Sequence, residues 1–196
     1  MIRTFLSGLN LLRDRRIVRD LGERRLHLQR IDLIRQKFPT AKLHNDLILI
    51  GFEPELLTLG KNTSVREGTV LSFGDAHNGH GHIRIGDNSW IGHYNNLRAG
   101  GGDITIGSGC LVSQFCSLVA SNHGLDKDVP IQQQPPGAKR GVTLDEDVWL
   151  GAGVHILPGV RVGRGAVLGA GSVVTRDVPE FEIWAGAPAK RIGQRE

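Results

Sequence analysis

Aliphatic residues recur every six positions from Leu59 to Val174, and this recurrence is the strongest pattern in the chain. The run from Leu144 to Val174 keeps the period without a slip. The residues that open the hexads are all Leu, Ile or Val: Leu59, Val65, Leu71; Ile85, Ile91, Leu97; Ile106, Val112, Leu118; Leu144, Leu150, Ile156; Val162, Leu168, Val174.

Two further hexad positions are restricted. Glycine often follows the aliphatic residue, at positions 60, 86, 92, 107, 151, 163 and 169. The fifth position is mostly small: Thr63, Thr69, Ser89, Cys110, Cys116, Val148, Val154, Val160, Ala166, Ser172. Glycine permits a sharp corner, and a small residue fits beneath it. Three hexads of 18 residues then make one coil, so the pattern predicts a triangular parallel β-solenoid of about five coils.

Residues 1–38 follow a helical pattern instead. Apolar side chains are separated by arginines in the spacing of amphipathic helices, and Pro39 is a plausible stop. One interpretation is a helical cap or an oligomer contact. The alternative is peripheral attachment to an anionic membrane surface, which the four interspersed acidic residues disfavour.

Composition narrows the class of protein. The chain has 27 glycines and only 5% aromatic residues, which indicates an aliphatic, turn-rich core. Its net charge of +4 divides into +6 over residues 1–38 and −2 over the remainder, so the body lacks the basic stripe of a nucleic-acid reader. No apolar run reaches 18 residues, the first residues do not suit a secretory signal, and two cysteines are too few for a disulfide framework. We expect a cytoplasmic protein.

These spacings resemble the hexapeptide-repeat transferases over residues 59–192, in particular the sugar, capsule and galactoside O-acetyltransferases. The segment Trp149 to Ile192 is similar to the closing region of sugar and antibiotic O-acetyltransferases in that family. The resemblance implies a left-handed parallel β-helix that uses acetyl-CoA as donor and needs no metal. It also implies a saccharide or related polar acceptor and a homotrimer with active sites in clefts between solenoids. The expected organisation is an all-β solenoid between two terminal segments: a helical arm over 1–45, the β-helix over 46–178 with an inserted loop at 119–143, and a C-terminal extension over 179–196.

Function is expected where the period breaks. The largest break adds 20 residues between Ile106 and Leu144, and His123 lies where the chain leaves the wall. An imidazole suits removal of a proton from a hydroxyl during acyl transfer, although spacing alone equally allows a loop histidine bonded to backbone. The resemblance favours catalysis, because the family's catalytic histidine occupies this place. It implies direct transfer in a ternary complex, with no covalent enzyme intermediate.

The resemblance carries over further site residues. Asn96 matches an acceptor-binding asparagine, and Trp149 matches the aromatic residue beside the pantetheine or the acceptor, whereas Trp90 is assigned to packing. The remaining cofactor-binding candidates resemble positions along pantetheine or near the nucleotide phosphates: Ala152, Ala170, Thr175, Arg176 and Lys190. Cys110 and Cys116 occupy inward positions and are discounted as nucleophiles.

Three rival functions remain. His77, His80, His82 and His93 suggest a metal site, as in γ-class carbonic anhydrases, but the paired histidine of that family is replaced by Arg98. The second rival is N-acetylation of an amino sugar with the same fold and donor. The third is a scaffold without catalysis.

Overall fold

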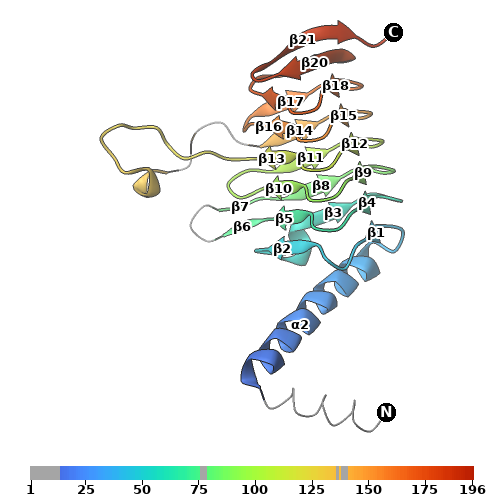
Figure 1. Ribbon diagram of the computed structural model, residues 1–196, viewed down its shortest axis with the longest axis vertical. Coiled ribbons are helices and arrows are strands. Elements are labelled where there is room, and N and C mark those ends of the chain that lie inside the picture. Colours follow the sequence, from blue (N-terminus) through green and yellow to red (C-terminus); the bar gives the residue numbers. More distant parts are fainter. Residues whose placement is uncertain (1–13, 76–78, 136, 138–140) are drawn as a thin grey trace.

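A computed structural model describes residues 14–75, 79–135, 137 and 141–196. Most strands stack into three parallel sheets, one for each side of a triangular solenoid (Figure 1). Wall A contains β1 (Lys42–Leu43), β4 (Ser64–Val65), β9 (Trp90–Ile91), β12 (Leu111–Val112), β15 (Trp149–Leu150), β18 (Val167–Leu168), β20 (Glu182–Gly186) and β21 (Ala189–Gln194). Wall B contains β2 (Ile48–Ile50), β5 (Val70–Ser72), β10 (Asn96–Arg98), β13 (Ser117–Val119), β16 (His155–Ile156) and β19 (Val173–Val174). Wall C contains β3 (Leu57–Leu59), β8 (Ile83–Ile85), β11 (Ile104–Ile106), β14 (Val142–Leu144) and β17 (Val160–Val162).

The chain visits walls A, B and C in turn, and each strand pairs in parallel with the equivalent strand of the next coil. The predicted all-β parallel solenoid is therefore confirmed. All fifteen aliphatic residues that open the hexads are buried, none with more than 5% of its surface exposed. Since every coil covers the apolar interior of its neighbour, the core is one continuous column of Leu, Ile and Val.

The solenoid has about six coils in the described part of the chain, one more than the hexads predict. The additional coil lies at the N-terminal end, where β1, β2 and β3 pair with β4, β5 and β8. Leu43 and Leu49 keep the six-residue spacing, but ten residues separate Leu49 from Leu59. The short helix η1 (Pro54–Leu56) occupies part of this interval, so the six-residue period is interrupted in the sequence although the strands of the first coil keep the register of the later coils.

Corner glycines have two different physical reasons. At Gly107 a side chain would come within 2.6 Å of the backbone of Asp145 and Glu146 in the next coil. At Gly109 nothing lies within 4 Å of the position that a Cβ atom would take, but the backbone has a φ of +70°. Residues with a Cβ atom rarely adopt this conformation, and glycine adopts it readily. The first position requires glycine for close approach, and the second requires it for conformation.

The two ends of the solenoid are covered differently. Helix α2 (Arg15–Lys37) has Asp14 as its N-cap and Phe38 as its C-cap, immediately before Pro39. Its last turns bury Ile31 and Ile34 against the first coil, and its N-terminal half extends away from the solenoid (Figure 1). At the other end β20 continues wall A in parallel and folds back as an antiparallel hairpin with β21. The apolar positions predicted before residue 14 lie outside the described residues.

Candidate active site

The largest interruption of the repeat is the loop between β13 on wall B and β14 on wall C, which projects to one side of the solenoid (Figure 1). Backbone hydrogen bonds close its neck: Gly124 N–H donates to Pro135 O (3.0 Å) and Gly137 N–H to Asn122 O (2.7 Å). At the wall, Gly141 N–H donates to Ala120 O (2.7 Å). The base of the loop is thus a fixed extension of the solenoid.

Gln134 holds the outer part of the loop together. Its side-chain oxygen accepts from Asp126 N–H (2.8 Å), and its amide nitrogen donates to the carbonyls of Asp126 (2.7 Å) and Val129 (2.6 Å). The side chain is buried, and the short helix η2 (Ile131–Gln133) precedes it. The Gln134 amide is therefore occupied in ordering the loop.

His123 lies in the neck of this loop and is exposed. The root of the loop is bonded to the neighbouring coil, because Ala120 N–H donates to Arg98 O (2.9 Å) and the Ser121 hydroxyl donates to Gly100 O. The root of the loop, three residues before His123, therefore lies beside the end of β10. An accessible imidazole on a hydrogen-bonded neck can meet a ligand that lies on wall B.

Wall B presents a ladder of polar side chains on β10, β13 and β16, next to that neck. Asn96 pairs with Ser117, and Ser117 pairs with His155 on the next strand. The Asn96 amide donates to the Ser117 hydroxyl (3.3 Å). Beside Asn96 is a hollow of about 370 Å³ lined by Ile50, Val70, Ser72, Gly74, Asn96, Arg98 and Gly100. The structure thus brings two predicted site residues, Asn96 and His123, to the same wall.

Trp149 lies elsewhere, on wall A, where its neighbours along the outer ladder are Leu111 and Val167. Half of its surface is exposed. In contrast, Trp90 is partly buried and its ring meets His93 edge-on, with 6.2 Å between centroids. Within one chain, Trp149 and His123 belong to different walls.

The other cofactor candidates lie at three places: the corner between walls A and B, the end of wall B after β19, and the C-terminal hairpin. Ala152 and Ala170 occupy this corner in successive coils, and Gly171 N–H donates to Ala152 O (2.8 Å). Thr175 and Arg176 follow β19 and are exposed, with the Arg176 guanidinium 5.2 Å from the centre of the Trp184 ring. Lys190 is exposed on β21, opposite Ala185. Small side chains make the corner between walls A and B shallow, while the cations Arg176 and Lys190 lie after β19 and on β21.

An aromatic pair at the same corner was missed by sequence reasoning. Tyr94 and Phe115 are exposed and stacked, with 5.7 Å between ring centroids and 9° between ring planes. Both have positive φ, +55° and +61°, which is unusual for bulky residues and often accompanies functional surfaces. A signal was available: both residues lie three positions after a hexad aliphatic, where Gly153 and Gly171 stand in later coils.

Both cysteines are buried side chains of the core, as their hexad position predicts. The Cys110 thiol donates to Asp145 O (3.1 Å) and the Cys116 thiol to Gly151 O (3.2 Å). Burial raises the pKa of Cys110 to about 11 and also raises the pKa of Cys116. Neither thiol is ionised near neutral pH, which removes both as nucleophiles.

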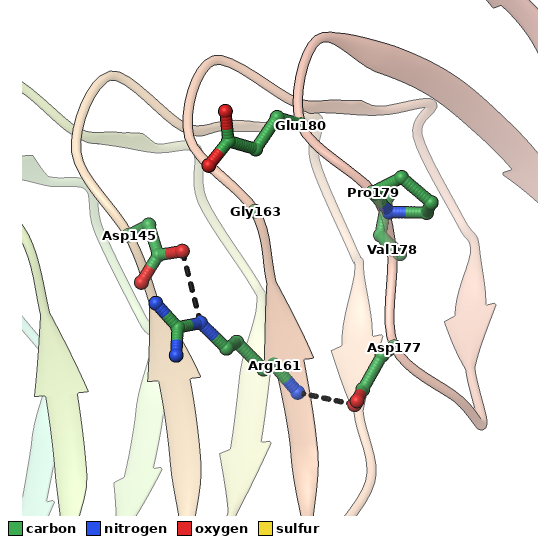
Figure 2. A pocket seen from close by; sticks show the side chains of 7 residues that line it. All are labelled: Asp145, Arg161, Gly163, Asp177, Val178, Pro179 and Glu180. Atoms are coloured by element: carbon green, nitrogen blue, oxygen red, sulfur yellow. Dashed lines mark hydrogen bonds and ion pairs between the residues drawn. The ribbon is translucent and has the colours of Figure 1, made fainter.

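A second hollow, of about 270 Å³, lies on wall C near the C-terminal end (Figure 2). Its arginine is already paired: Arg161 donates to the Asp145 carboxylate (3.0 Å), and the Arg161 backbone N–H donates to Asp177 (2.8 Å). The charges in this hollow bind one another, so it is a weaker candidate for a ligand site than wall B.

The histidines do not form a metal site in the part of the chain that the structure describes, where no group of three or more His, Cys, Asp or Glu residues could hold an ion. His80 is exposed on β7 (Gly79–His80), which pairs with β6 (Gly74–Asp75), and His93 meets Trp90. His77 lies outside the described residues. Among the same residues, no helix is long and apolar enough to cross a bilayer.

Comparison with known proteins agrees with the repeats. Residues 141–176 match the family described as bacterial transferase hexapeptide (six repeats). The chain is 36% identical over 110 residues to a putative acetyltransferase, YJL218W, of Saccharomyces cerevisiae, covering 56% of this chain and 55% of the relative. It is 30% identical over 135 residues to the galactoside O-acetyltransferase of Escherichia coli, covering 69% and 62%. The chain thus spans about half the length of the curated relatives it matches.

Solved structures share the fold at low sequence identity. AntD, an N-acyltransferase from Bacillus cereus in complex with dTDP and 3-hydroxybutyryl-CoA, has a TM-score of 0.67 at 23% identity, covering 80% of this chain and 81% of AntD. A maltose O-acetyltransferase from Clostridium difficile has a TM-score of 0.56 at 21% identity, covering 95% and 88%. This chain is a hexapeptide-repeat β-solenoid protein. Its predicted resemblance to the hexapeptide-repeat acetyltransferases is confirmed.

Proposed function

We propose that the protein transfers an acetyl group from acetyl-CoA to a hydroxyl of a saccharide or related polar acceptor. The observation that carries the proposal is the exposed imidazole of His123 on a hydrogen-bonded neck, next to a wall that presents Asn96 and a hollow. The relatives support the same chemistry, since several are named acetyltransferases.

His123 acts as the general base in this proposal. It takes the proton of the acceptor hydroxyl, whose oxygen attacks the thioester carbonyl of acetyl-CoA. The carbon–sulfur bond then breaks, and the departing thiolate receives the proton from the imidazolium. Asn96 holds the acceptor on wall B through its amide. A covalent enzyme intermediate is not required, and the buried thiols of Cys110 and Cys116 are unsuited to forming one.

Acetyl-CoA is proposed to extend along the corner between walls A and B. Ala152 and Ala170 leave the backbone of successive coils accessible, which suits the narrow pantetheine chain. Thr175 and Arg176 follow β19 and Lys190 lies on β21; in this proposal Thr175 contacts the donor and the two cations bind its nucleotide phosphates. A flat track with charge at one end matches a long donor that carries its phosphates at one terminus.

A homotrimer would complete this site. His123 and Asn96 belong to wall B and Trp149 to wall A, so one chain alone does not bring them together. We therefore place wall B of one chain against wall A of its neighbour in a threefold ring, since closed symmetric rings are a common oligomeric form. Light scattering is expected to give three times the chain mass of 21.3 kDa. A monomer at assay concentration would contradict the shared site.

Replacing Trp149 by alanine is expected to raise the KM for acetyl-CoA about tenfold, equivalent to about 1.4 kcal/mol, with kcat changed less than about twofold. The reason is that half of this large ring is exposed and free to contact the donor. Steady-state kinetics at saturating acceptor measure the effect. Trp90→Ala, two strands away on the same wall, is the matched control. Equal KM values for the two variants would remove Trp149 from the donor site.

Thiol release from acetyl-CoA, measured with a panel of hydroxyl and amino acceptors, tests the function. O-acetylation predicts turnover with hydroxyl acceptors. N-acetylation is the second candidate, because a tetrahydropyridine-dicarboxylate N-acetyltransferase of Staphylococcus aureus is 51% identical over 61 residues, 31% of this chain and 25% of that enzyme. Turnover with amino sugars alone would favour the second candidate, and no acceptor-dependent release would favour a scaffold.

A further inference from the structure

Wall B carries an arginine, Arg98, whose guanidinium has no partner among the described residues. Arg98 ends β10, is exposed, and lines the wall B hollow. Within the described residues its guanidinium makes no hydrogen bond or ion pair. The wall C arginines differ: Arg84 pairs with Asp103 (2.7 Å) and Arg161 with Asp145 (3.0 Å). Arg98 is therefore available to a ligand in a way that Arg84 and Arg161 are not.

The surroundings of Arg98 reinforce this difference. None of the residues in the six strands of wall B is Asp or Glu, so no carboxylate on these strands competes for the guanidinium. The Asn96 side chain lies two residues away on the same outer face, where its amide bonds Ser117. The six strands of wall B consequently offer one arginine, neutral polar groups and no carboxylate.

The hollow also has the size and composition of a small-molecule site. Its volume of about 370 Å³ falls in the range typical of such sites. Ile50 and Val70 provide an apolar surface, while Asn96 and Arg98 provide polar groups at one side. A sugar ring is suited to such a mixture, since its carbon faces are apolar and its substituents are polar.

The backbone links Arg98 directly to the root of the catalytic loop. The Arg98 carbonyl accepts from Ala120 N–H (2.9 Å), three residues before His123, and the Ser121 hydroxyl donates to Gly100, which lines the hollow. One ligand can thus occupy the hollow and approach the loop neck.

We propose that the acceptor carries an anionic group, a carboxylate or a phosphate, and that Arg98 binds this group in the wall B hollow. The guanidinium presents parallel N–H donors that match either anion, and hydrogen bonds to charged groups are stronger than neutral ones. This inference rests on the proposed function for the identity of the ligand as an acceptor. The binding of an anion at Arg98 is a separate property of the wall.

Transfer assays with three matched acceptors test the proposal: methyl galactoside, galacturonate and galactose 1-phosphate. The wild-type protein is expected to have a kcat/KM at least tenfold higher for one of the anionic acceptors than for the neutral one. Arg98→Gln is expected to lower that value by about 10- to 100-fold and to leave the neutral acceptor within about twofold. Arg84→Gln removes the same charge from wall C and is the control, with no selective loss. Whichever anionic acceptor is preferred shows whether Arg98 binds a carboxylate or a phosphate.

Equilibrium binding of the same three compounds, with and without coenzyme A, separates this inference from the proposed function. Anion-selective binding that Arg98→Gln abolishes and Arg84→Gln retains supports the anion site, even where no acetyl transfer is detected; that combination would refute only the proposed function. Equal binding of neutral and anionic sugars, or anion binding that is unchanged in Arg98→Gln, overturns the inference.

Discussion

Replacing His123 by alanine is expected to lower kcat by about 10²- to 10⁴-fold, the usual contribution of a general base. The alanine side chain cannot take the proton of the acceptor hydroxyl, whereas the binding surfaces on walls A and B are unchanged. The KM values for both substrates should therefore move little. Thiol release from acetyl-CoA at saturating acceptor measures the loss.

The control for this variant is His44→Ala, which removes a partly exposed imidazole from the first coil, remote in sequence from the loop. Both variants should keep the wild-type circular dichroism spectrum and melting temperature within a few degrees, because neither side chain belongs to the core. Unchanged turnover in His123→Ala, with His44→Ala also active, would show that another group removes the proton.

Replacing Gly107 by alanine is expected to reduce the free energy of unfolding by about 3 kcal/mol or more, the upper part of the range for overpacked sites. The added carbon would lie 2.6 Å from backbone atoms of the next coil, and neither backbone can move without disturbing the stacked hexads. Urea denaturation at a fixed protein concentration, followed by circular dichroism, measures the loss.

Gly109→Ala provides a matched comparison two residues away. Nothing lies within 4 Å of its added carbon, so only the positive φ opposes the substitution, at a cost of about 1 to 2 kcal/mol. The two alanines therefore separate steric contact from backbone conformation. Equal destabilisation by both would mean that coil spacing adjusts to the added carbon at Gly107, and that the corner is less constrained than its geometry implies.

The repeating part of the fold was predictable because the hexad period alone decides which side chains point inward. Each inward residue is buried by equivalent residues one coil away, so no information about distant contacts is needed. Cys110 and Cys116 illustrate this: their hexad position was sufficient to predict buried, unreactive thiols. The first coil escaped detection because ten residues separate Leu49 from Leu59, and a period cannot be followed across an irregular interval.

The site was predictable only residue by residue. The break in the period and the family resemblance pointed to His123 and Asn96, and both lie on the wall B side. Trp149 was selected by the same resemblance, but within one chain it lies on wall A, whereas Asn96 and the root of the His123 loop lie on wall B. The stacked pair Tyr94 and Phe115 was overlooked, since stacking joins residues 21 positions apart in different coils.

The sequence by itself determined the solenoid, its interior, the position of the loop and the choice of His123 as the general base to test. Tertiary structure alone decided which outward side chains meet. It separated Trp149 from His123, assigned Gln134 to ordering the loop, and paired Arg84 and Arg161 with carboxylates. Among the residues that the structure describes, it left the Arg98 guanidinium without a partner in the wall B hollow. The physical reason is that inward positions depend on a local period, whereas ion pairs and hollows depend on distances between coils.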